Sequence, residues 1–180
     1  MKGRTLYIYP EQYEGQESDP LIFCTGPVPA QQVDPFIPWL MRKTGAKKFY
    51  LPSADYIWPH VMNQRVREVV TAHGGSIVGE EYFPLDHTDY RRVVADIMST
   101  GAEVVFNTIV PPGLTPFLEQ LHNAGFGARG GRLVCTYFDE NFLAPVSCIS
   151  HGKKGSTCCA GTGPVQKIKG WHSWPSYCSG

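Results

Sequence analysis

The sequence predicts an α/β fold, in which a parallel sheet carries helices on both faces. Between residues 47 and 137, short runs with strand chemistry alternate with longer runs in which apolar residues recur at helical spacing, in the order βαβαβαβ. This alternation is typical of a parallel sheet with right-handed crossovers. At 180 residues, with 42% hydrophobic and 18% charged residues, the chain can bury one core, so a single main domain is expected.

Two short strands and one helix are expected before residue 46. Residues 5–9 are aromatic and alternate, residues 21–25 form a second apolar run, and Pro10 ends the first run. Because nothing precedes the first strand, we expect it to lack a pairing partner. Gly45 closes the helix, and Pro38 inside it predicts a late start or a kink; the apolar stripe is Val33, Phe36, Ile37, Leu40 and Met41.

The central unit is a strand, an aromatic turn and a helix. Residues 47–51 have strand chemistry, and we expect Pro52 to end the strand because proline cannot donate to a continuing ladder. Residues 53–55 are then turn material, before a helix over residues 60–73 whose first turn suits Pro59. The two aromatics of the turn, Tyr56 and Trp58, either meet a ligand or plug the top of the sheet.

The remaining elements follow in the same alternation. Strands are expected over residues 76–83, 102–109 and 132–137. A helix with its N-cap region at residues 86–89 and a second helix beginning at Leu114 separate these strands.

A ligand crevice is expected where three strands end. The turns at residues 53–58, 108–113 and 137–140 open on one edge of the sheet, and ligands of open α/β sheets bind there. These turns contain no Arg or Lys to clamp a carboxylate or phosphate, so a small neutral polar ligand fits best. The candidate lining residues are Tyr56, Val110 and Tyr137, with Asp55, Asn107 and Thr108 as polar groups.

Several classes of function are disfavoured. Sixteen basic and sixteen acidic residues leave no net field for nucleic acid or anionic lipid, and no apolar run is long enough to span a membrane. No phosphate loop or dinucleotide fingerprint is present, so no cofactor is expected. Ser53, Asp55 and His60 lie close in sequence without a nucleophile elbow, so no catalytic role is expected. As written, the chain has no signal peptide and is expected in the cytoplasm.

Four motifs carry a resemblance to a known family. Residues 9–15 (YPEQYEG), 26–32 (GPVPAQQ), 53–59 (SADYIWP) and 79–85 (GEEYFPL) resemble, in order and spacing, type I periplasmic-binding-protein-like sensors. The sequence is most similar to the aliphatic amidase expression-regulating protein, to nitrile hydratase regulators, and to urea or short-amide binding proteins of ABC importers. The resemblance extends from about residue 6 to residue 142.

The resemblance implies two α/β lobes that close on a small ligand, with ligand contacts at Tyr9, Tyr56 and Val110. It also implies that residues 1–32 are a remnant of the first lobe and of the approach to the hinge, and that residues 33–143 are one ligand-binding lobe. The sequence departs from the amidase sensor at Glu11 and Gln12.

Three functions follow as hypotheses. The first is a small-amide-sensing regulator of amidase or nitrile hydratase expression, with a neutral amide or urea-like ligand and a regulator protein as partners. The second is the substrate-binding component of an ABC transporter for urea, short amides or amino acids, with a permease as partner and a periplasmic or cell-surface location if a missing N-terminus carries a signal peptide. The third is a non-functional gene remnant.

The tail over residues 144–180 differs from the rest of the chain. All sixteen acids precede residue 143, whereas the tail holds four lysines and four of the six cysteines. We therefore expect a read-through in a shifted frame or an unrelated extension, which translation of the other frames tests. A zinc site on its His and Cys residues is disfavoured because the C-x2-C spacing is absent. Cys24 and Cys135, in the body, are expected to be buried free thiols.

Overall fold

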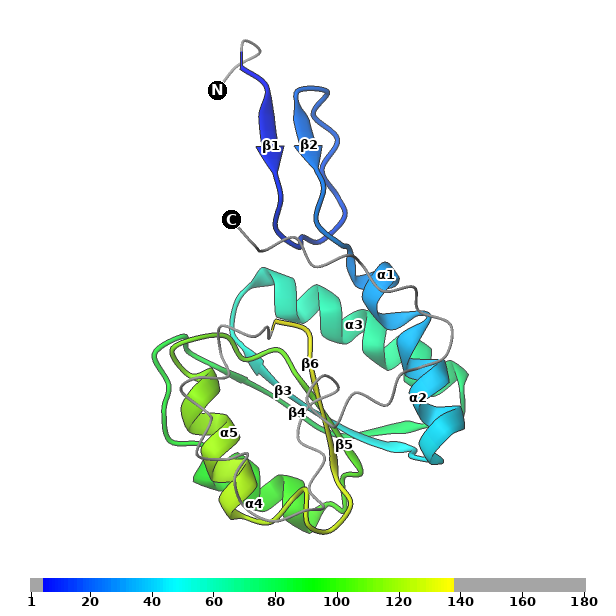
Figure 1. The fold of residues 1–180 in the computed structure, drawn as a ribbon, viewed down its shortest axis with the longest axis vertical. Coiled ribbons are helices and arrows are strands. Elements are labelled where there is room, and N and C mark those ends of the chain that lie inside the picture. The colour runs from blue at the N-terminus through cyan, green and yellow to red at the C-terminus, as the bar shows by residue number, and fades with distance from the viewer. Residues whose placement is uncertain (1–4, 138–180) are drawn as a thin grey trace, which may run out of the picture.

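The computed structural model describes residues 5–137, which form a four-stranded parallel sheet with helices on both faces and a separate two-stranded sheet (Figure 1). The elements in chain order are β1 Tyr7–Tyr9, β2 Ile22–Cys24, α1 Pro29–Val33, α2 Phe36–Thr44, β3 Lys48–Ala54, α3 Ile57–Ala72, β4 Ser76–Phe83, α4 Arg91–Ser99, β5 Val104–Asn107, α5 Leu114–Asn123 and β6 Arg132–Cys135.

The larger sheet has the strand order β4-β3-β5-β6, and all its pairings are parallel. The chain runs from β3 outward to β4 and then crosses back over β3 to reach β5. The direction of winding therefore reverses between β3 and β5, which is the point where open α/β sheets bind ligands. The predicted βαβαβαβ order and the predicted fold class are confirmed.

Each face of this sheet has its own apolar core. The helices α1, α2 and α3 cover one face, and α4 and α5 cover the other (Figure 1). On the first face Phe49 and Phe106 pack with Met62 and Val66 of α3. On the second face Tyr50, Phe117 and their neighbours are buried in the same way. Because alternate side chains of a strand point to opposite faces, β3 and β5 are buried on both sides, as parallel strands usually are.

The expected end of β3 at Pro52 is wrong. The strand continues to Ala54, and Pro52 stays paired with Glu81 of β4. The Pro52 carbonyl accepts a hydrogen bond from the Thr108 N–H at 3.1 Å, so the hydrogen-bonding side of Pro52 faces β5. The missing donor therefore interrupts only the β5 ladder, while the alternate residues Leu51 and Ser53 continue the pairing with β4.

Two helices begin close to a proline. Pro38 is the third residue of α2, so the helix has a late start rather than a kink. Pro59 is the third residue of α3, as expected, although α3 begins at Ile57, three residues before the predicted start. The first N–H groups of a helix have no intrahelical partner, so proline costs no hydrogen bond at these positions.

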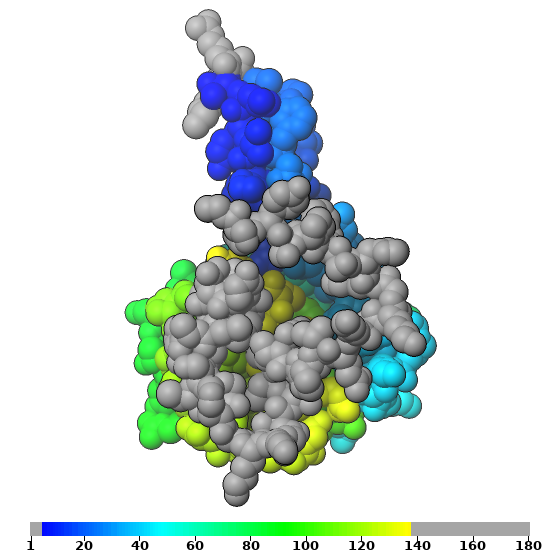
Figure 2. Space-filling view, in the orientation of Figure 1, coloured from blue at the N-terminus to red at the C-terminus, as the bar shows by residue number. Residues whose placement is uncertain are grey.

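The expectation that the first strand lacks a partner is also wrong. β1 pairs in parallel with β2, in the register Tyr7 with Ile22 and Tyr9 with Cys24. Figure 2 shows this two-stranded segment projecting from the rounded body that holds the larger sheet. It leaves Leu6, Ile8 and Phe23 more than half exposed.

Some predictions need correction or fall outside residues 5–137. Cys24 is a free thiol, and both Cys24 and Cys135 are half-buried rather than buried. The predictions for residues 144–180, including the shifted frame and the disfavoured zinc site, lie outside the described residues, as does most of the third predicted turn. Within the described part of the chain, no helix is both long and apolar enough to cross a membrane.

Candidate functional site

The turn after β3 separates its two aromatic residues. Asp55 N donates to Phe83 O at 2.7 Å and Tyr56 N donates to Ala54 O at 3.1 Å, so the end of β4 holds the turn. Trp58 is only 3% exposed and belongs to the core under α3, whereas Tyr56 is 37% exposed. Trp58 is therefore a packing residue, and Tyr56 is the aromatic that a ligand can reach.

Polar groups under the turn are engaged with one another. The Asn63 side chain donates to Ser53 Oγ at 2.7 Å, and both residues are fully buried. His60 Nε2 lies 2.9 Å from Asp55 Oδ1, and the His60 ring stacks on Tyr82. Ser53 thus pairs with Asn63 and His60 with Asp55, so these residues do not form the hydrogen-bonded chain that nucleophilic catalysis needs.

Buried polar residues stabilise the turn after β5 through hydrogen bonds. Asn107 accepts a hydrogen bond from Ile109 N at 3.2 Å and donates to Ile109 O at 3.3 Å. Thr108 is fully buried and its backbone bonds Pro52 and Ala54 of β3. Val110, which follows, is half-buried. Asn107 and Thr108 therefore shape this turn, and a direct contact of Thr108 with a ligand remains a prediction.

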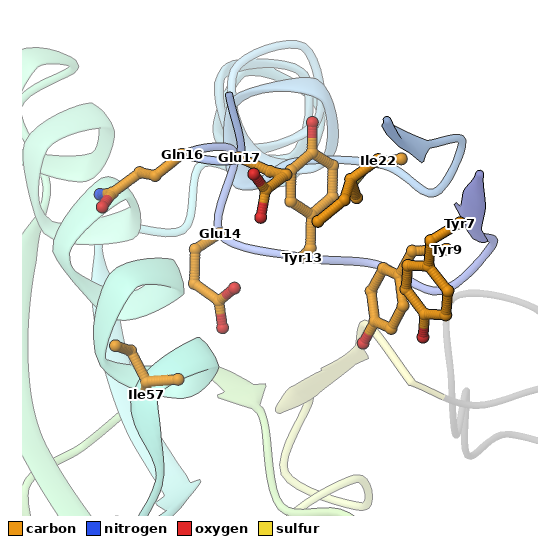
Figure 3. Close-up of a pocket in the computed structure, with 9 residues that line it drawn as sticks. Tyr7, Tyr9, Tyr13, Glu14, Gln16, Glu17, Ile22 and Ile57 are labelled. Atoms are coloured by element: carbon orange, nitrogen blue, oxygen red, sulfur yellow. The ribbon is translucent and has the colours of Figure 1, made fainter. Parts of the chain in front are cut away.

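A cavity of about 430 Å³ lies between the β1–β2 segment and the N-terminus of α3 (Figure 3). Tyr9, the residue expected from the family resemblance, lines it, and so does Ile57, the residue next to Tyr56. The lining residues are Tyr7, Tyr9, Tyr13, Glu14, Gln16, Glu17, Ile22, Cys24 and Ile57.

Electrostatic interactions link Tyr9 with Tyr56 in the turn after β3. Burial, together with the smaller electrostatic contributions of Tyr137, Glu14 and Tyr9, raises the pKa of Tyr56 to about 12. Burial also raises the pKa of Tyr9, together with the nearby charges of Glu11 and Glu14. The fold thus brings three predicted residues, Tyr9, Tyr56 and Tyr137, into one negatively charged region. Asp55 lies on the same turn as Tyr56, where it pairs with His60.

The lining of the cavity carries two carboxylates and, among the described residues, no Lys or Arg. Sequence reasoning identified Tyr9 but did not single out Glu14, although Glu14 stands inside the quoted YPEQYEG motif. The residues that the structure describes include no group of three or more His, Cys, Asp or Glu that could hold a metal ion.

Comparison with known proteins places this geometry in context. The sequence profile of the periplasmic binding protein domain matches residues 2–147. A solute-binding protein of an ABC transporter from R. palustris, solved with 4-hydroxybenzoate, is 26% identical, with a TM-score of 0.59 over 66% of this chain and 32% of that one. A solute-binding protein from Rhodopseudomonas palustris BisB5, solved with 3,4-dihydroxybenzoic acid, is also 26% identical, with a TM-score of 0.55 over 65% of this chain and 32% of that one.

An amino acid ABC transporter substrate-binding protein from Pseudomonas fluorescens Pf-5 shares the fold, with a TM-score of 0.61 at 15% identity over 72% of this chain and 35% of that one. The chain therefore spans about a third of the length of these solved structures. The expected relationship to periplasmic binding proteins is confirmed, whereas the closer likeness to amidase and nitrile hydratase regulators stays a prediction.

Proposed function

This chain belongs to the periplasmic binding protein domain family, a family of non-enzymatic ligand-binding proteins, and we propose that it forms one wall of a binding site for a small uncharged polar ligand in an ABC-type solute-binding protein. A short amide or urea is the ligand class that the wall suits best. The observation that carries the proposal is that Tyr9 lines a cavity together with Ile57, the residue next to Tyr56, and that Tyr9 and Tyr137 lie close enough to Tyr56 to raise its pKa.

Tyrosine hydroxyls suit this ligand class because they both donate and accept hydrogen bonds. An amide or urea presents a carbonyl acceptor and N–H donors, and the phenol rings cover its apolar part. The hydroxybenzoate ligands of the two solved relatives carry a carboxylate, which needs a positive partner in a partly buried site. The described lining holds carboxylates instead of such a partner, which favours a neutral ligand.

The importer role is supported by the solved relatives, whose names identify them as components of ABC transporters. The regulator of amidase or nitrile hydratase expression, expected from the sequence motifs, would use the same ligand wall. Both roles share the amide-binding step, so that step is the first to test.

The test is a titration of the 180-residue chain with acetamide, propionamide and urea, followed through the backbone NMR signals of Tyr9 and Tyr56. We expect saturable shifts with a dissociation constant weaker than about 1 mM, because hydrogen bonds made in open water leave little net gain. Sub-millimolar affinity would show that this wall suffices alone. Signals at Tyr9 and Tyr56 that do not move would contradict the proposed function.

A further inference from the structure

Glu14 holds a distinctive position in the candidate site. The backbone on either side of it is fixed, because Tyr13 N donates to Pro27 O at 3.3 Å and Gly15 adopts a left-handed φ of 88° against Val28. Glu14 itself is half-buried. Figure 3 shows its carboxylate pointing into the space between Tyr9 and Ile57. Local backbone geometry thus directs a negative charge into the cavity.

Each of the two neighbouring carboxylates accepts backbone hydrogen bonds through one of its oxygens. Glu17 accepts hydrogen bonds from the backbone N–H groups of Ser18 and Asp19, at 2.8 and 2.7 Å. Glu11 accepts one from Gln12 N at 3.0 Å. Among the described residues, no hydrogen bond or ion pair engages the carboxylate of Glu14. Its oxygens are therefore available as acceptors for a donor inside the cavity.

The charge of Glu14 also acts on the phenols of Tyr9 and Tyr56. After burial, it contributes to the raised pKa of Tyr9 and of Tyr56. A negative charge that disfavours the ionised form of two neighbouring phenols also disfavours a ligand carboxylate in the same space. It favours a ligand group that presents N–H donors.

We propose that Glu14 determines the specificity of this site, accepting a hydrogen bond from an N–H group of the ligand and excluding ligands that present a carboxylate there. The inference rests on the proposed function and narrows its ligand class to carboxamides and ureas. It separates this chain from the two solved relatives, whose ligands are hydroxybenzoic acids.

Paired ligands that differ only in the acid or amide group test the proposal. Propionamide is compared with propionate, and 4-hydroxybenzamide with 4-hydroxybenzoate, by NMR titration of the full chain. We expect the wild type to prefer each amide by about tenfold or more, since like charges a few ångströms apart repel at this scale in a partly exposed site. In Glu14→Gln the preference should fall by about tenfold, because Gln keeps an acceptor but carries no charge.

The control is Glu119→Gln, which removes the same charge from an exposed position on α5 outside the cavity lining. This variant should keep the wild-type preference. Salt gives a second readout: raising its concentration from about 10 mM to about 1 M should weaken the wild-type preference by screening and change the preference of Glu14→Gln less. Binding with an unchanged amide preference in Glu14→Gln would overturn the role of Glu14 and leave the proposed function standing. Absence of binding by all four ligands would overturn the proposed function itself.

Discussion

The four-stranded sheet and the β1–β2 segment are built from similar apolar and aromatic residues, but they bury them very differently. Six of the seven residues of β3 and all four of β5 are buried, whereas β1 and β2 contain no buried residue. Parallel strands usually have both faces covered, and a two-stranded sheet adds little stability by itself. Tyr56 therefore lies next to a well-packed core, whereas Tyr9 lies on a segment that adds little stability by itself.

The largest expected effect tests this contrast with one substitution in each region. Phe106→Ala in β5 removes a ring that is 1% exposed and should lower the free energy of unfolding by about 3–5 kcal/mol. Phe23→Ala in β2 removes a ring that is mostly exposed and should change it by less than about 1 kcal/mol. Urea denaturation followed by circular dichroism measures both. Equal losses would mean that β2 contributes as much to the fold as β5.

The next effect concerns the two aromatics at the end of β3. Trp58→Ala should destabilise the fold by about 3 kcal/mol, because the ring is buried in the core beneath α3. Tyr56→Ala should cost about 1 kcal/mol or less, because its ring is partly open to solvent. Thermal unfolding of the two variants side by side distinguishes them. A loss of 3 kcal/mol in Tyr56→Ala would show that Tyr56 plugs the sheet.

The sequence predicted the body of the fold well because its elements are long and strongly periodic. It failed at Pro52, because the effect of a proline on a strand depends on which neighbouring strand its missing N–H would have faced. Pro52 was expected to end β3, but its missing donor affects only the β5 side of the strand. The pairing of β1 was missed because a parallel partner lies later in the chain, beyond a loop that periodicity does not describe.

The candidate site was predicted only in part. Tyr9, Tyr56 and Tyr137 came from motifs and strand ends, and the fold brings them together. The roles of Tyr56 and Trp58 could not be separated in advance, because the direction of one turn decides which ring is buried. Glu14 escaped notice because its direction depends on the backbone beside Gly15 and on contacts with residues 27 and 28.

A smaller effect concerns the polar groups that support the β3 turn. Burial opposes the charge of Glu80, but hydrogen bonds from Tyr82 and Arg67 outweigh it and hold the pKa of Glu80 below its ordinary value of 4.5. A depressed folded-state pKa gives stability that is present above pH 4.5 and is lost as the pH falls through the folded value. Glu80→Gln should therefore cost about 1–2 kcal/mol at pH 7 and progressively less toward pH 3.

Urea denaturation at pH 7, 5, 4 and 3 measures this dependence. Glu119→Gln, an exposed glutamate on α5, is the matched control and should parallel the wild type across the series. A Glu80→Gln variant whose deficit stays constant down to pH 3 would show that the carboxylate charge does not contribute.

The smallest expected effect compares the hydroxyl of Tyr50, in the core on one face of the sheet, with that of Tyr56, in the turn after β3. Tyr50 is buried, and its hydroxyl donates to Glu81 at 2.6 Å, so Tyr50→Phe should lower stability by about 1 kcal/mol and leave propionamide binding unchanged.

Tyr56→Phe should leave stability nearly unchanged and weaken propionamide binding. Its hydroxyl has no hydrogen bond within the described part of the chain, so unfolding should change by less than about 0.5 kcal/mol. Propionamide binding should weaken by about two- to tenfold, which corresponds to one lost hydrogen bond in a partly solvated site. Urea denaturation and NMR titration of both variants give the four values. If Tyr56→Phe binds propionamide as the wild type does, the phenol acts only as an apolar surface, and the hydrogen-bonding role of this wall falls to Tyr9 and Glu14.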